Sequence, residues 1–409
     1  MTASPVRVGL IAAWPVYYHA PLYRLVAGDS RVDFTAVFAS SAGVRAFDRG
    51  FGKPTTWGDE TLHGYRSIFL RSADVRRPGG FWSLRDVDIA AVLRRERFDV
   101  LMLHGYNSFT HLAASLVQRT LGGAVVYREE QTLLRPRSRW RRAAKYVPLR
   151  TLFAGASALY IGTENRRWFE HYGIPANKLF YSPYAVDNRF LQERSNGLSA
   201  RRDELRAGFE IRRANDPVFV FVGRLIAQKR VDLLIEAFSR VRKHVMCTLL
   251  IVGSGPLESA LRRFAAERDI PDVLFAGFAT PERVHEAYAA SDVFCMTSMS
   301  ETWGIVVNEA MNFGLPLVLS SQVGSARDLV LAGETGYVVR TVDETVQAMK
   351  RLATDSELRL AMSERARAHV RAFSYEAAAR GVAAAVSHVV GPGRWRAACG
   401  VGAEREQAR

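Results

Sequence analysis

The chain has 409 residues, of which 48% are hydrophobic and 24% are charged, and its formal net charge is +15. This length and balance predict a globular protein with room for two domains, and they exclude a disordered or fibrous chain. The longest apolar runs, at 8–16 and 217–223, are shorter than the roughly 18 residues that a transmembrane helix needs. The first run has no convincing cleavage site behind it, so we interpret it as a strand and not as a signal peptide.

Buried strands and amphipathic helices alternate along the first half of the chain. Continuous apolar runs predict strands at 6–13, 32–39, 99–105, 124–129 and 158–163. Helical periodicity predicts helices at 84–96 and 109–121.

The second half repeats this alternation. Strands are predicted at 217–223, 248–253, 273–278, 293–298 and 316–321, and helices at 231–241, 257–269, 282–291 and 305–314. Such alternation is typical of parallel sheets covered by helices on both faces. The expected fold class is therefore α/β, with two doubly wound, Rossmann-like domains.

The domain boundary is expected in the polar, strand-poor stretch at 187–215. We assign 1–195 to an N-terminal domain and 200–373 to a C-terminal domain. Residues 374–390 are expected to form a helix that crosses back to complete the first domain, and 391–409 to form a loose tail.

Most of the positive charge lies in the first half. Residues 1–200 hold 28 Lys and Arg against 16 Asp and Glu, whereas 201–409 hold 28 against 25. The segment 135–150, with seven basic residues, no acid, Trp140 and Tyr146, suits either a solvated helix or an anionic membrane surface. No nucleic-acid-binding motif accompanies the charge, so no nucleic-acid partner is expected. Three widely spaced cysteines indicate reduced thiols in a cytoplasmic protein.

Three candidate ligand sites in the second half follow predicted strands. In the first, GRLIAQKR (223–230), Gly223 makes a turn that presents Arg224 and Lys229, a pair suited to a diphosphate. The second, GSGPLE (253–258), has Glu258 where a dinucleotide motif needs its third glycine. We interpret Gly253 as a tight turn that allows close ligand approach, and we expect no nicotinamide or other cofactor.

The third site is SETWGIVVNEA (300–310). Here Glu301 lies in a loop and Glu309 on the helix that Gly304 starts, so the amides around Gly304, Ile305 and Val306 can receive phosphate oxygens. Carboxylates are strong acceptors for sugar hydroxyl groups. The two glutamates can bind hydroxyl groups on either side of these phosphate-binding amides, an arrangement that suits a nucleotide-diphosphate sugar.

The order and spacing of five segments resemble the C-terminal half of the family 4 GT-B glycosyltransferases: VGRLIAQKRVDLLIEAF, IVGSGPL, FAGF, SETWGIVVNEAMNFGLPLVLS and GETGYVV. These are retaining enzymes that use nucleotide sugars without a metal. The resemblance covers about 215–340, and 174–187 is similar to the segment before the family's linker.

The resemblance implies roles for individual residues. Arg224 and Lys229 would hold the donor diphosphate, Glu301 would contact the transferred sugar and Glu309 the ribose. Arg224, Lys229 and Glu301 would be the catalytic residues. The two cations would stabilise the negative charge that develops on the leaving group. Glu301 could alternatively be a nucleophile. Phe278 would lie near the nucleotide base.

The N-terminal half departs from the family pattern. The loop after the first strand reads AAWPVYYHAPLYR (12–24) instead of a glycine-rich sequence, and Tyr127 is followed by Arg128, with no histidine. His19, His104 and Arg128 are therefore the candidates for the acceptor or sugar side.

No metal site is expected. Asp86 and Asp88 resemble a metal-binding DxD motif, but Ser83 and Asp86 have the spacing of a capping box at a helix start. Trp303, between the two glutamates, can serve packing or ligand stacking.

The predicted function is a retaining hexosyltransferase that uses a UDP- or GDP-linked sugar and a glycan, lipid-linked or small-molecule acceptor, in surface polysaccharide or glycoconjugate synthesis. Its expected location is the cytoplasm, including the inner face of the membrane through 135–150. The alternatives are a sugar-nucleotide epimerase or hydrolase of the same fold, and a non-catalytic scaffold.

Overall fold

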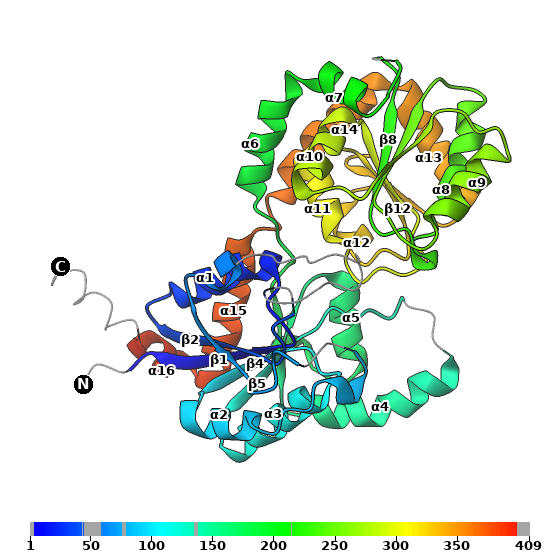
Figure 1. Cartoon of the computed structure of the whole chain (residues 1–409). Coiled ribbons are helices and arrows are strands. Elements are labelled where there is room, and N and C mark those ends of the chain that lie inside the picture. The colour runs from blue at the N-terminus through cyan, green and yellow to red at the C-terminus, as the bar shows by residue number, and fades with distance from the viewer. Residues whose placement is uncertain are drawn as a thin grey trace, which may run out of the picture.

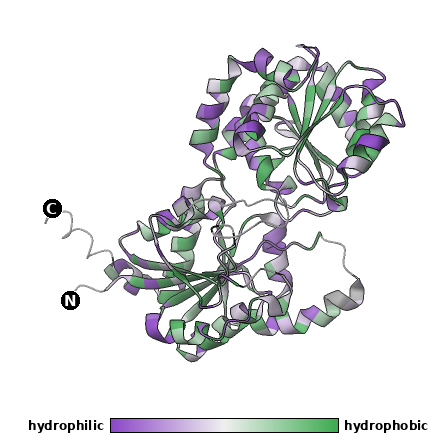
Figure 2. Cartoon of the chain, viewed as in Figure 1, coloured by the Kyte–Doolittle hydropathy of each residue, from purple (hydrophilic) through white to green (hydrophobic). Residues whose placement is uncertain are grey.

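The computed structural model describes residues 4–42, 44, 59–75, 79–134, 138–213 and 215–398, except for the side chains of residues 139, 141 and 142. The chain forms two lobes, each built around one parallel sheet (Figure 1). The strands of both sheets are mostly hydrophobic, and polar residues gather on the surrounding helices (Figure 2). Within the described residues, no helix combines the length and hydropathy that crossing a bilayer requires.

The first sheet has seven strands in the order β3-β2-β1-β4-β5-β6-β7. They are β1 Val6–Ala12, β2 Val32–Phe38, β3 Arg66–Phe69, β4 Val100–His104, β5 Ala124–Arg128, β6 Ser157–Tyr160 and β7 Leu179–Tyr181. The five strands predicted in this half are confirmed. Strands β3 and β7 were not predicted, because they have only four and three residues.

Helices cover both faces of this sheet (Figure 1). The α-helices are α1 Ala20–Ala27, α2 Ile89–Glu96, α3 Phe109–Thr120, α4 Arg139–Phe153 and α5 Thr163–His171. Short 3-10 turns are η1 Tyr17–His19, η2 Asp59–Leu62, η3 Phe81–Ser83 and η4 Ala176–Lys178.

The predicted capping box at Ser83 and Asp86 is wrong. Helix α2 begins only at Ile89, and the Ser83 hydroxyl donates to the carbonyl oxygen of Gly80 at 2.7 Å. Asp86 is buried, and its backbone N–H donates to the hydroxyl oxygen of Thr110 at 3.0 Å. A tertiary contact with α3 therefore holds this segment in place of a helix cap.

The second sheet has six strands in the order β10-β9-β8-β11-β12-β13. They are β8 Val218–Val222, β9 Thr248–Val252, β10 Val273–Gly277, β11 Val293–Met296, β12 Leu317–Ser320 and β13 Gly336–Val339. Its helices are α8 Val231–Arg242, α9 Glu258–Ala266, α10 Pro281–Ala290, α11 Ile305–Asn312, α12 Ala326–Leu329, α13 Val342–Thr354 and α14 Ser356–Val370, with a 3-10 turn, η5 Ala227–Lys229. The predicted strand and helix order of this half is confirmed.

The segment between the sheets forms two helices, α6 Asn188–Ser199 and α7 Arg202–Gly208. Leu191 and Leu198 of α6 belong to the hydrophobic core of the second lobe. Helix α6 therefore packs in the second lobe, although the sequence analysis assigned its residues up to 195 to the first domain. The lobes also meet where the backbone N–H and the hydroxyl group of Thr163 donate to the carboxylate of Asp328.

Helix α15, Tyr375–Val390, crosses back to the first lobe as expected (Figure 1). Its buried face, including Ala378, Val382 and Ala385, packs in the same core as β1, β2 and β4. It is followed by α16, Pro392–Ala397, whose Trp395 is buried. The expectation of a loose tail from 391 is therefore wrong for 391–398, and the rest of that tail lies outside the described residues.

Two helical glycines predict opposite effects of the same substitution. A Cβ on Gly381 of α15 would clash with the backbone carbonyl group of Tyr181, whereas one on Gly197 of α6 would meet open space. We expect Gly381→Ala to destabilise the protein by about 1–3 kcal/mol, because α15 must move away from β7. Gly197→Ala should stabilise it by about 0.5–1 kcal/mol through helix propensity. Chemical denaturation of both variants checks this, and equal effects would contradict the packing argument.

Candidate functional site

One pocket, which we call the C-terminal pocket, lies at the carboxyl ends of β8, β9 and β10 and has a volume of about 290 Å³. Parallel sheets collect ligands at this edge. Seven of the predicted donor-site residues line it: Gly223, Arg224, Gly253, Phe278, Ile305, Val306 and Glu309. The structure therefore brings together side chains from segments far apart in the sequence.

Glycines give this pocket its shape. A Cβ on Gly253 would clash with the carbonyl group of Gly223, so the ends of β8 and β9 approach this closely only because Gly253 has no side chain. Gly304 caps α11 with a φ of 88°, a left-handed conformation that favours glycine. The first residues of α11, Ile305 and Val306, consequently face the pocket at the helix N-terminus.

The predicted cations occupy two different environments. Arg224 is exposed at the pocket, and among the described residues its guanidinium has no ion pair or hydrogen bond. Lys229 instead forms an ion pair with the carboxylate of Glu301 beside the pocket, and both side chains are only 16% exposed. The Glu301 loop is held by the backbone N–H of Glu301, which donates to the Gln322 carbonyl oxygen at 3.1 Å.

Glu309 lies at the other side of the C-terminal pocket. Burial raises its pKa to about 7, and the Tyr288 hydroxyl donates to its carboxylate at 3.2 Å. Tyr17, from the first lobe, lines the same pocket, where burial raises its pKa and the charge of Glu309 adds to the effect. The sequence analysis missed Tyr17, because only the tertiary fold brings the loop after β1 to α11.

Trp303 serves packing. It is 2% exposed, and its indole N–H donates to the side-chain oxygen of Asn308 at 2.8 Å. This contact resolves the choice between packing and ligand stacking in favour of packing.

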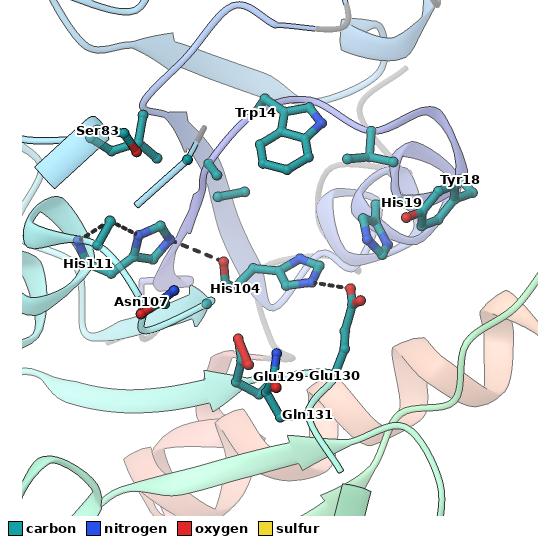
Figure 3. A pocket seen from close by; sticks show the side chains of 17 residues that line it. Trp14, Tyr18, His19, Ser83, His104, Asn107, His111, Glu129, Glu130 and Gln131 are labelled. Atoms are coloured by element: carbon teal, nitrogen blue, oxygen red, sulfur yellow. Dashed lines mark hydrogen bonds and ion pairs between the residues drawn. The ribbon is translucent and has the colours of Figure 1, made fainter. Parts of the chain in front are cut away.

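Another pocket, the N-terminal pocket, lies at the carboxyl ends of β1, β4 and β5 and has a volume of about 300 Å³. Figure 3 shows His19 and His104 turned toward Glu130, with Trp14 on the opposite wall. The His104 ring nitrogen Nε2 lies 3.3 Å from Glu130 Oε1, and the Tyr184 hydroxyl also donates to Glu130. The predicted acceptor-side residues His19 and His104 therefore share one pocket.

Burial shifts the pKa values of ionisable side chains in this pocket. Burial raises the pKa of Glu129 to about 8, with the neighbouring Glu130 carboxylate adding to the effect. Burial also lowers the pKa of His19 well below its ordinary value, with His104 and Arg128 contributing. The sequence analysis missed Glu129 and Glu130 as pocket residues, although their position directly after β5 could have indicated them.

The structure places Arg128 behind the pocket and not in its lining. Its side chain is buried, and its guanidinium donates to the hydroxyl oxygen of Ser182 at 2.6 Å and to the Ser182 carbonyl oxygen at 3.2 Å. These bonds join β5 to the end of β7. The arrangement is that of a structural contact and gives no support to Arg128 as a sugar ligand.

Comparison with known proteins supports the resemblance to glycosyltransferases that the sequence indicated. Residues 203–369 match the family described as "Glycosyl transferases group 1". The chain is 32% identical over 213 residues to the alpha-D-kanosaminyltransferase of Streptomyces kanamyceticus, covering 51% of this chain and 53% of that protein. It is 32% identical over 225 residues to the GDP-mannose-dependent alpha-(1-6)-phosphatidylinositol monomannoside mannosyltransferase of Mycobacterium tuberculosis, covering 52% and 56%. The chain thus spans about half the length of these curated relatives.

Solved structures share the whole fold. The glycosyltransferase from Rickettsia africae superposes with a TM-score of 0.72 at 12% identity, covering 94% of this chain and 99% of that one. Anabaena HepE in complex with UDP and glucose gives a TM-score of 0.66 at 17% identity, covering 94% and 100%.

The two facing α/β lobes and the returning α15 define the GT-B fold, which confirms the fold class expected from sequence. Within that class, residues 203–369 match the glycosyl transferases group 1, and the resemblance to GT-B glycosyltransferases is confirmed.

Proposed function

We propose that the protein is a retaining, family 4-type glycosyltransferase that moves a hexose from a nucleotide-diphosphate sugar to an acceptor. The observation that carries the proposal is the C-terminal pocket, where Arg224, which has no ion pair within the described part of the chain, the N-terminus of α11 and Glu309 meet beside the Lys229–Glu301 pair. Sugar-transferring relatives over half of the chain add support.

In this proposal the protein supplies positive charge where the diphosphate leaves. Breaking the bond between sugar and phosphate leaves a diphosphate anion and a sugar with oxocarbenium character. Arg224 and Lys229 bind the diphosphate oxygens together with the amides of Ile305 and Val306. The negative charge that develops on the diphosphate is therefore stabilised by fixed cations and by the helix dipole. No metal ion is needed at this leaving group.

Glu301 is proposed to position the transferred sugar. It already pairs with Lys229, so a bound diphosphate would share the ammonium group and free carboxylate oxygen atoms for sugar hydroxyl groups. An anion that is neutralised by an ammonium group is a weak nucleophile, which favours positioning over covalent catalysis.

The donor is proposed to be UDP- or GDP-linked. Glu309 accepts the ribose hydroxyl groups, and the base lies near the half-exposed ring of Phe278. Anabaena HepE was solved with UDP, whereas the mycobacterial relative is GDP-mannose-dependent, so both bases are to be tested.

The acceptor is proposed to bind in the N-terminal pocket, with His19 and His104 as contacts. The acceptor would be a glycan, a lipid-linked sugar or a small molecule of surface polysaccharide or glycoconjugate synthesis; nucleic acid is not proposed.

Helix α4 exposes Trp140 and Val147, each 67% exposed, next to basic residues. We propose that 135–150 docks on the anionic inner face of the cytoplasmic membrane.

The test combines donor binding with turnover. A thermal-shift screen of UDP- and GDP-sugars should identify a donor that raises the melting temperature, because a ligand that binds the native state stabilises it. Mass spectrometry should then detect transfer to added sugar acceptors and little consumption of donor alone. Rapid turnover without acceptor would indicate an epimerase or hydrolase, and absence of donor binding would indicate a scaffold.

A further inference from the structure

Three potential metal ligands from separate elements converge in the N-terminal pocket. His19 belongs to η1, His104 is the last residue of β4, and Glu130 follows β5 by two residues. One ligand atom from each lies within 4.8 Å of the other two. Figure 3 shows the rings of His19 and His104 and the carboxylate of Glu130 pointing toward one another.

The side chain of His19 lacks a polar partner. It is 4% exposed, and among the described residues neither of its ring nitrogens has a hydrogen bond. Its ring is instead held by the aromatic rings of Tyr18 and Tyr184, at centroid distances of 4.5 and 5.4 Å. Buried polar groups normally have hydrogen-bond partners, so a buried imidazole that is directed at His104 and Glu130 without one indicates a ligand-binding role.

The other two ligands are oriented by their neighbours. Glu130 accepts a hydrogen bond from the Tyr184 hydroxyl, which leaves its second carboxylate oxygen available. The carbonyl group of His104 lies 3.1 Å from the His111 ring nitrogen Nε2, and Ser108 holds the other nitrogen of that ring at 2.7 Å. The Tyr184 contact fixes the direction of the Glu130 carboxylate, as outer contacts of metal sites commonly do, and the His111 contact fixes the backbone from which His104 projects.

We propose that His19, His104 and Glu130 form a binding site for a divalent transition-metal ion of the zinc type. Two imidazole nitrogens and one carboxylate oxygen are the donor set of open zinc sites. Metal–ligand bonds of about 2.1 Å place tetrahedral ligands roughly 3.4 Å apart, so a small side-chain closure suffices. The remaining position faces the pocket, where water or a polar ligand can complete the shell.

This site lies in the proposed acceptor pocket, where His19 and His104 would contact the acceptor through the metal, and it is separate from the proposed donor site. None of its three ligands lines the C-terminal pocket, where Arg224 and Lys229 serve the diphosphate. The proposed site departs from the expectation of no metal, which rested on cysteine spacing and the Asp86–Asp88 motif, because sequence spacing does not show that η1, the end of β4 and the loop after β5 meet.

The experiment is a zinc titration of the untagged, full-length protein after treatment with a chelator. Isothermal titration calorimetry should give one zinc equivalent per chain, with magnesium giving no saturable signal. His19→Ala, His104→Ala and Glu130→Gln should each weaken zinc binding at least about tenfold. His244→Ala, which changes an exposed histidine outside the pocket, should not change it.

A second measurement keeps the result independent of folding defects. Cobalt(II) bound in place of zinc should give visible absorption bands in the wild type and in His244→Ala, and no bands in a folded His19→Ala variant. Full zinc affinity in His19→Ala, or no stoichiometric zinc binding by the wild type, would overturn the proposal. Binding of a nucleotide sugar, measured on the same samples, reports the donor site separately, so failure of one proposal is distinguishable from failure of the other.

Discussion

Lys229→Ala is expected to lower kcat/KM for sugar transfer by about 10²- to 10³-fold, the usual effect of removing one group that stabilises developing negative charge. The ammonium group is held at the end of η5 against Glu301, beside the glycine turn of Gly223. It is therefore in place before the donor binds. A steady-state assay with the donor found in the thermal-shift screen measures the loss.

The same assay distinguishes the role of Lys229 from that of Glu301. Glu301→Ala should also abolish most of the transfer, because the carboxylate is proposed to hold the sugar, whereas donor diphosphate binding should fall more in Lys229→Ala. UDP or GDP without a sugar should consequently bind Glu301→Ala nearly normally. Lys243→Ala, an exposed lysine at the end of α8, is the matched control. Full transfer activity in both Lys229→Ala and Glu301→Ala would contradict the site assignment.

The second lobe was predictable because its signals are local. Most residues of each strand are apolar, and turn glycines such as Gly223, Gly253 and Gly304 directly follow or precede an element. The carboxyl ends of parallel strands meet at one edge, so residues after the strands could be placed together without coordinates. Seven of them now line one pocket.

The first lobe was less predictable because its pocket depends on long-range contacts. Glu130 is oriented by Tyr184, which is 54 residues further along the chain, and Arg128 is withdrawn from the pocket by Ser182. The capping-box error at Ser83 has the same origin, since Thr110 replaces the local cap of Asp86. Sequence spacing carries no information on such pairs.

One short turn connects the two pockets. In η1, Tyr17 lines the C-terminal pocket beside Glu309, while its neighbours Tyr18 and His19 line the N-terminal pocket. Tyr18 also packs against the core of the second lobe. A donor that displaces Tyr17 therefore acts on the element that carries an acceptor-side histidine, which gives the two proposed substrates a direct physical connection.

Donor affinity should rise with pH if Glu309 accepts the ribose hydroxyl groups. Burial raises the pKa of this carboxyl group to about 7, so it is mostly protonated at pH 6 and mostly ionised at pH 8. Only the ionised form accepts from both hydroxyl groups, and the dissociation constant should fall about tenfold between these pH values. The probe must be an intact nucleotide sugar, because the terminal phosphate of a free nucleoside diphosphate itself titrates at about pH 6. Glu309→Gln should bind weakly at both pH values and remove the pH dependence.

Stability should change in the opposite direction without a donor. The folded pKa of Glu309 lies above its ordinary value, so from about pH 4.5 to 7 the folded protein keeps a proton that the unfolded chain releases, and stability falls as pH rises through this window. The melting temperature of Glu309→Gln, which stays neutral, should therefore exceed that of the wild type by more at pH 8 than at pH 5. Glu357→Gln, an exposed glutamate of α14, should show no such trend. If donor affinity rises with pH in the wild type and equally in Glu309→Gln, another group titrates, and the assignment of Glu309 to the ribose is wrong.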